Sequence, residues 1–128
     1  MSLQQELDDF MAQVRTQVPA DVLAPIERFY AEELHAAGRF PKVLTVGQQA
    51  PLFELPDAHG RPVRLDELLA RGPVVLSFYR GAWCPFCNME LRALQQILPA
   101  LQAVGATLVA VSPELPDHSL PMVERALR

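Results

Sequence analysis

Two apolar runs with a long helical pattern between them restrict this chain to the α/β fold class. Residues 74–79 form a nearly continuous apolar run, which is typical of a central strand covered on both faces. A helical pattern begins at the Cys84–Cys87 segment, and Gly105 is expected to end it. Thr107–Val111 predicts a second buried strand. The two strands should be parallel, because a helix of this length makes a right-handed crossover between them.

Two further helices are predicted over residues 1–40. Ser2 can cap the first of them in a capping box. The second should have its cap near Asp21, with Pro25 close to its first turn. We interpret residues 1–40 as a helical extension for packing or dimerisation, and residues 41–128 as the main domain.

A β-hairpin is expected at the start of the main domain. Residues 51–55 and 62–65 predict its two short strands, joined by a turn at 57–60. Asp66 can cap a short helix after it. At the other end of the chain, a last helix is expected to run to Arg128.

The only two cysteines of the chain, Cys84 and Cys87, are three positions apart. A disulfide across so short a loop adds little stability, because the entropy removed grows with loop length. The pair therefore indicates chemistry. Placed between a strand and a helix, Cys84 should lie at the helix N-terminus, where free N–H groups and the helix dipole stabilise a thiolate. Pro85 fits the first helical position, and Cys87 is near enough to attack a mixed disulfide at Cys84.

Two other interpretations of the cysteine pair stay open. The cysteines can be inert apolar residues, or half of a zinc site. A structural zinc site has four ligands, and the remaining candidates, His35, His59 and His118, show no paired spacing. We expect no metal and no cofactor beyond a redox-active Cys84–Cys87 disulfide.

Residues beside the pair are candidates for supporting roles. Trp83 is expected to be partly buried and to shield one side of the thiols. Arg80 either lowers a thiol pKa or holds a peroxide oxygen, or it is a solvated cation at a strand end. Pro113, Glu114 and His118 follow the second strand at its C-terminal end, where functional loops gather in parallel sheets.

The overall charge argues against several classes of partner. The net charge is −4, and no run of Lys or Arg forms a phosphate-binding face, so nucleic acid is not expected. No apolar stretch is long enough to cross a membrane. Residues 1–10 lack the basic start and apolar middle of a secretory signal. We therefore predict a cytoplasmic protein, in a compartment that keeps thiols reduced.

Four segments together resemble a known family. They are Val46-Gly-x-x-Ala-Pro51-x-Phe53, the run 74–79, Arg80-Gly-Ala-Trp-Cys-Pro-Phe-Cys87 and Val111-Ser-Pro113. These segments are similar to the peroxiredoxin-like group of the alkyl hydroperoxide reductase/thiol-specific antioxidant superfamily. The resemblance implies a thioredoxin-like fold and reduction of peroxides or disulfides through the Cys-Pro-Phe-Cys motif. It also implies a thiol reductant such as thioredoxin, glutaredoxin or glutathione.

The resemblance allows two registers for the attacking cysteine. Peroxiredoxins typically carry Pro-x-x-x-(Thr/Ser)-x-x-Cys. Counting back from Cys87 puts Cys84 in the Thr place and Arg80 in the Pro place, whereas counting back from Cys84 gives Gly81 and Ser77. We predict Cys84 as the nucleophile and Cys87 as the resolving cysteine, because Cys84 lies nearer the exposed end of the helix. Cys87 is the peroxidatic cysteine in the alternative register.

Family members usually continue with further strands, among them a cis-proline strand that faces the cysteines. The chain is therefore expected to form a partial thioredoxin-like fold, and an open strand edge should drive it to a homodimer or strand-swapped oligomer. Three hypotheses follow for its function: a thiol oxidoreductase, a non-catalytic oligomeric module of the same fold, and a zinc-binding module.

Overall fold

A computed structural model describes residues 1–34, 43–116 and 118–119 of the chain. The chain divides into two compact units, Met1–Ala50 and Pro51–Arg128. The predicted boundary between residues 40 and 41 lies outside the described residues, as does most of the predicted last helix. Each unit is therefore described by itself.

The first unit begins with helix α1, Leu3–Gln17, and the predicted capping box is confirmed. The Ser2 hydroxyl accepts from the backbone N–H of Gln5 at 3.3 Å, and the Gln5 side chain accepts from the Ser2 N–H at 2.9 Å. Toward the end of the helix, Arg15 forms a 2.9 Å ion pair with Glu27 of the next helix. Both ends of α1 are thus fixed by polar contacts.

The second helix, α2, spans Ala20–Arg28 and differs from the prediction at its start. Its N-cap is Pro19, which makes no side-chain capping bond, so the predicted cap near Asp21 is wrong. Asp21 instead lies in the first turn, where a negative charge favours the positive end of the helix dipole. Pro25 lies inside the helix rather than close to its first turn, and the chain continues from Phe29 to Leu34 as the π-helix η1.

The second unit opens with the predicted hairpin, in a shifted position. Strand β1, Glu54–Pro56, pairs antiparallel with β2, Pro62–Arg64, and Leu55 lies opposite Val63. The turn between them depends on Asp57, whose carboxylate accepts from two backbone N–H groups and from the Arg61 guanidinium. These bonds hold the pKa of Asp57 below its ordinary value, chiefly through the Arg61 N–H.

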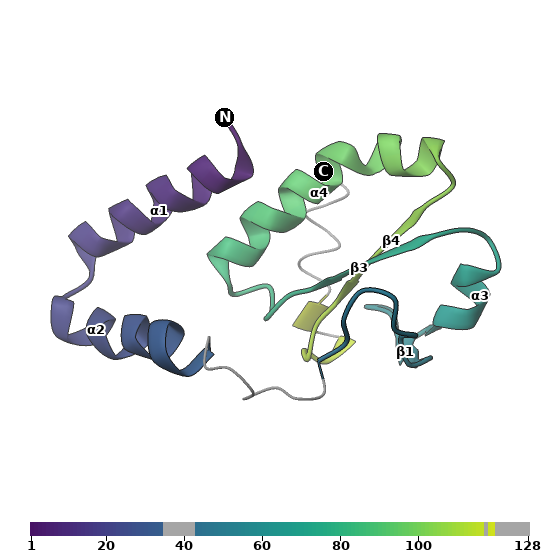
Figure 1. The fold of residues 1–128 in the computed structure, drawn as a ribbon, viewed down its shortest axis with the longest axis horizontal. Coiled ribbons are helices and arrows are strands. Elements are labelled where there is room, and N and C mark those ends of the chain that lie inside the picture. The colour runs from purple at the N-terminus through teal and green to yellow at the C-terminus, as the bar shows by residue number, and fades with distance from the viewer. Residues whose placement is uncertain (35–42, 117, 120–128) are drawn as a thin grey trace. The chain divides into compact units, whose positions relative to one another are not determined.

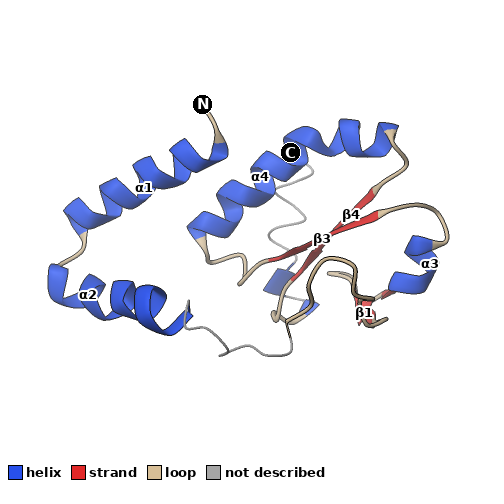
Figure 2. Ribbon diagram, viewed as in Figure 1, coloured by secondary structure: helices blue, strands red, loops and turns tan. Residues whose placement is uncertain are grey.

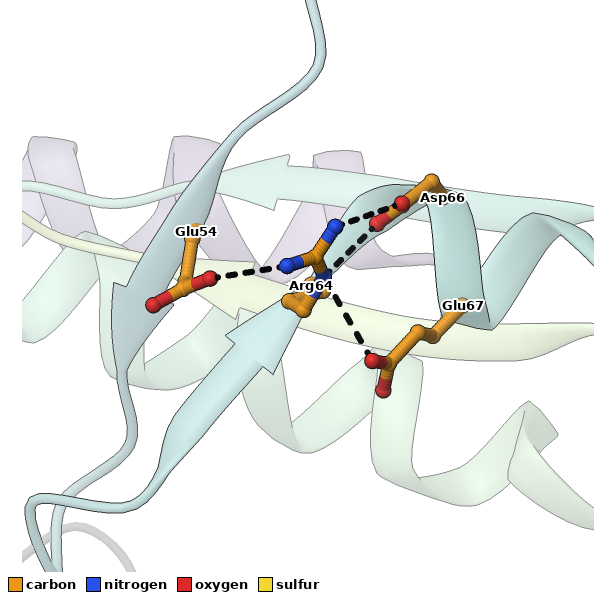
Figure 3. A network of polar contacts seen from close by, with 4 residues as sticks. All are labelled: Glu54, Arg64, Asp66 and Glu67. Carbon is orange, nitrogen blue, oxygen red and sulfur yellow. Dashed lines mark hydrogen bonds and ion pairs between the residues drawn. The ribbon is translucent and has the colours of Figure 1, made fainter.

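A short helix, α3, follows directly at Leu65–Leu69, and Figure 3 shows how it is joined to the hairpin. The Arg64 guanidinium contacts Glu54 at 3.2 Å, Asp66 at 2.8 Å and Glu67 at 3.4 Å. Asp66 lies in the first turn and not at the N-cap, so its predicted capping role is wrong. All four side chains are substantially exposed, so these ion pairs stabilise the fold only weakly.

The strand–helix–strand unit predicted from the apolar runs is confirmed (Figures 1 and 2). Strand β3, Val74–Phe78, is parallel to β4, Thr107–Val111, and helix α4, Pro85–Ala103, connects them and packs against β4. The ladder continues one residue further, because the Tyr79 N–H donates to the Val111 carbonyl at 2.9 Å. The expectation that β3 is covered on both faces is wrong: most of it is half-buried, and Phe78 is 73% exposed.

The end of α4 agrees with the sequence. Pro99 lies inside the helix, where a proline removes one backbone hydrogen bond, and the ribbon of α4 changes direction along its length in Figure 1. Gly105 follows the C-cap with a φ of +73°, a conformation that glycine adopts without strain. A side chain at Gly72 would collide with the Gly105 carbonyl oxygen, so the chain must approach itself closely at this end of the sheet.

None of the helices within the described residues is both long enough and apolar enough to cross a lipid bilayer.

Candidate functional site

The cysteine segment lies where β3 passes into α4. The backbone N–H of Cys84 donates to the Gly81 carbonyl at 3.1 Å, which closes a turn between the strand and the helix. Cys84 is the N-cap of α4, and Pro85 occupies its first turn as the sequence predicts. The strand thus delivers both cysteines to a helix N-terminus, the position that favours a thiolate.

The two thiols are free and buried, and polar donors converge on them. The Cys84 side chain is fully buried, and its Sγ accepts from the Cys87 N–H at 3.4 Å and from Arg80 Nη2 at 3.1 Å. Cys87 is 8% exposed, and its Sγ accepts from the Arg80 N–H at 3.5 Å. The expectation that Cys84 is the more exposed of the two is therefore wrong. Arg80 contacts both sulfurs, the Cys84 sulfur through its guanidinium and the Cys87 sulfur through its backbone N–H.

The pKa of the Cys87 thiol is lower than its ordinary value. Burial raises this pKa, but it is outweighed by hydrogen bonding with Cys84 and by the N–H and the guanidinium of Arg80. A buried sulfur is therefore able to carry a negative charge in this turn, since donors replace the water it has lost.

Trp83 does not shield the thiols as predicted. Its side chain is 67% exposed, and the Arg80 guanidinium carbon lies 5.6 Å from the centre of its ring. The guanidinium therefore contacts both the indole ring and the Cys84 sulfur.

Two side chains from outside the Cys-x-x-Cys segment reach the turn. Glu114, which the topology had placed near the site, accepts from the Ala82 N–H at 3.0 Å. Asn88 donates to the Ala82 carbonyl at 3.0 Å and was not among the residues predicted from sequence. Its position one turn after Cys84 on the helix was the available signal. The other two neighbours expected from topology, Pro113 and His118, are exposed.

Metal-binding groups are not gathered near the thiols. Within residues 1–34, 43–116 and 118–119, no three or more His, Cys, Asp or Glu side chains are close enough to hold a metal ion.

The chain is similar to known proteins in sequence and in fold. Residues 46–126 match the model of the AhpC/TSA family. A curated protein of Mycobacterium tuberculosis whose name classes it with the peroxiredoxins is 39% identical over 69 residues, which are 54% of this chain and 45% of that protein. Thiol-disulfide oxidoreductase ResA of Geobacillus thermodenitrificans is 36% identical over 69 residues, 54% of this chain and 38% of its own length. The chain thus spans less than half the length of these curated relatives.

Solved structures show the same likeness. Peroxidoxin BcpB of Mycobacterium tuberculosis superposes with a TM-score of 0.63 at 33% identity, over 66% of this chain and 55% of that one. A thiol:disulfide interchange protein of a Bacteroides species gives a TM-score of 0.56 at 26% identity, over 66% of this chain and 55% of its own.

Proposed function

Because this chain belongs to the AhpC/TSA family and has a partial thioredoxin-like fold, we propose that it is a thiol-based oxidoreductase that reduces hydroperoxides through Cys84 and Cys87. One observation carries this proposal: Arg80 donates to both sulfurs at the start of α4, with its guanidinium 3.1 Å from Cys84 and its N–H 3.5 Å from Cys87. Two thiols that share a cation are suited to a cycle between dithiol and disulfide.

The burial of the sulfurs favours a small substrate. Cys84 has no exposed surface and Cys87 only 8%. To react, a disulfide of another protein must place its sulfur next to the buried thiolate, and the surrounding protein hinders this. A hydroperoxide is small enough to reach the same sulfur through a narrow opening. Disulfide reduction, the activity named for ResA, is the alternative substrate class for the same thiols.

We assign the first attack to Cys87, in the reverse order to the sequence-based prediction. The lowered pKa of Cys87 and its residual exposure both favour it over the fully buried Cys84. The Cys87 thiolate attacks the terminal oxygen of the hydroperoxide, so a sulfur–oxygen bond forms, the O–O bond breaks, and the alkoxide leaves and takes up a proton as the alcohol. Cys87 is then a sulfenic acid.

Cys84 resolves this intermediate. Its sulfur attacks the Cys87 sulfur, the Cys84–Cys87 disulfide forms, and the sulfenic oxygen leaves with two protons as water. An external dithiol or glutathione supplies the two electrons that restore the thiols. Thioredoxin and glutaredoxin are proteins of the class that fits this step. No metal or other cofactor takes part.

The supporting residues have separate parts in this scheme. Arg80 holds negative charge on the sulfur pair and on the departing oxygen. Trp83 restricts the Arg80 guanidinium through its ring. Pro85 begins α4 at a position where its missing N–H leaves no helix bond unmade, and the Cys87 N–H in the same turn donates to Cys84.

Adding hydroperoxide to the reduced protein tests the proposal. Peroxide should disappear in a one-to-one ratio with protein, and the protein mass should fall by two hydrogen atoms as the disulfide forms. With a thiol reductant present, consumption should continue. A reduced protein that keeps both thiols and leaves the peroxide intact contradicts the proposal, and it favours the non-catalytic module. Metal analysis of the same reduced sample tests the zinc-binding module.

A second copy of the chain is the partner we propose for its sheet. In the described residues β3 and β4 form a two-stranded parallel sheet, whereas parallel sheets are usually larger and covered on both faces. We expect sedimentation at micromolar concentration to give a homodimer or a strand-swapped oligomer, and a folded monomer there would contradict this.

We also propose that the protein is cytoplasmic, since a reducing compartment suits a chain with no cysteines besides this pair.

A further inference from the structure

The backbone N–H and the backbone carbonyl of Ala82 are each bound by a side chain that the proposed chemistry does not use. Its N–H donates to Glu114 Oε2 at 3.0 Å, and its carbonyl accepts from Asn88 Nδ2 at 3.0 Å. Ala82 lies midway between Arg80 and Cys84 in the chain. The clamp therefore acts on the segment that sets the distance between guanidinium and sulfur.

Glu114 is itself held in place by the end of β4. Its backbone N–H donates to the Ser112 hydroxyl at 3.1 Å, directly after the strand. On the neighbouring strand, the Tyr79 N–H donates to the Val111 carbonyl at 2.9 Å. The backbone of Glu114 and the beginning of the cysteine loop are thus both bonded at the C-terminal ends of the paired strands β3 and β4.

The carboxylate also packs directly on the loop backbone at Gly81. A Cβ atom there would lie 2.6 Å from Glu114 Oε1 and 2.7 Å from its carboxyl carbon, and it would meet the Trp83 indole nitrogen as well. Gly81 has a φ of +154°, which side chains rarely adopt. The absence of a side chain at Gly81 is what lets Glu114 reach the Ala82 N–H.

We propose that Glu114 and Asn88 are positioning residues that clamp the backbone of Ala82 and so hold the Arg80 guanidinium against Cys84. This inference deepens the proposed function and rests on it. The hydrogen bonds of both side chains end on the loop backbone, so they act on the thiols through Arg80. Without the clamp, the loop is free to move, and the 3.1 Å contact between Arg80 and Cys84 is no longer maintained.

The test compares Glu114→Ala with Glu114→Gln. The glutamine keeps an acceptor for the Ala82 N–H and removes only the charge, whereas alanine removes the acceptor. The first readout is the pH titration of thiolate absorbance in the reduced protein, and the second is the rate of peroxide consumption at neutral pH. We expect Glu114→Ala to raise the titration midpoint by about one pH unit and to slow the reaction about tenfold. Glu114→Gln should stay within about twofold of the parent, because the acceptor bond is kept.

A second clamp variant and a control variant complete the test. Asn88→Ala releases the Ala82 carbonyl and is expected to shift the midpoint in the same direction. It keeps the test open if Glu114→Ala does not fold. Glu32→Ala, an exposed carboxylate in the other unit, is the matched control and should leave both readouts unchanged.

Two results would overturn the clamp. One is a titration midpoint that neither Glu114→Ala nor Asn88→Ala moves, and the other is an equal shift in Glu114→Gln and Glu114→Ala. The titration needs no peroxide, so it separates the two proposals. An inactive parent protein with a shifted midpoint in Glu114→Ala rejects only the peroxidase function, and an active parent with an unshifted midpoint rejects only the clamp.

Discussion

Replacing Cys87 with serine is expected to bring peroxide consumption down to the rate of a solution without protein. In the proposed order of events Cys87 provides the first thiolate, and a serine hydroxyl at this site stays protonated and does not attack the peroxide. Cys84→Ser should behave differently, because its Cys87 thiolate still reacts once. The protein then gains one oxygen atom as a sulfenic acid and stops, since the resolving sulfur is missing. Peroxide assays and intact-protein mass spectrometry measure both outcomes.

The chain offers a clean background for this experiment. It has only two cysteines, so each variant retains one thiol and every oxidation product is assigned without ambiguity. The opposite pattern, in which Cys84→Ser abolishes the first reaction and Cys87→Ser gains the oxygen, would restore the order predicted from sequence. Reaction of neither single variant with peroxide, while the parent protein forms a disulfide, would contradict both orders.

The part of the fold that is local in sequence could be predicted well. The order of β3, the cysteine turn, α4 and β4 followed from two apolar runs and a helical spacing. The parallel pairing of the two strands, with Val74 opposite Thr107, confirms it. The capping box at Ser2 was also predictable, because its partner is only three residues away. The prediction of a cap near Asp21 was wrong. The helix begins directly after Pro19, before the first side chain that is able to cap it.

The position of the candidate site in the fold could be predicted, but the exposure of its side chains could not. The Cys-x-x-Cys spacing located both thiols at a helix start, and Arg80 was identified as a neighbour. The full burial of Cys84 and the exposure of Trp83 depend on how the turn folds back after β3, which no local pattern encodes. Glu114 reaches Ala82 from 32 residues away, so the sequence indicated only that it lies near the site, and Asn88, six residues away, was not predicted although its helical spacing from Cys84 was visible.

Arg80→Met is expected to move the pH dependence of the peroxide reaction upward. The guanidinium helps to hold the pKa of Cys87 below its ordinary value, so the wild-type rate should reach its plateau at lower pH than that of a free thiol, whose pKa is about 8.5. Methionine keeps much of the length of the side chain and removes its charge, so the thiolate forms only at higher pH. Each unit of upward shift lowers the rate near neutral pH by about tenfold, while the backbone N–H of residue 80 still bonds to Cys87.

The shape of the whole profile separates two effects of the same side chain. If Arg80 acts only on the thiolate population, the variant recovers the parent rate above its new midpoint and slightly exceeds it, because a more basic thiolate is a better nucleophile. If Arg80 also stabilises the departing oxygen, the plateau itself falls. Arg80→Lys keeps the charge but not the planar guanidinium, and it should lie between parent and Arg80→Met in midpoint. Arg92→Met, on the exposed face of α4, is the control. An unchanged midpoint in Arg80→Met would show that the guanidinium, although 3.1 Å from Cys84, does not affect the pH dependence of the reaction.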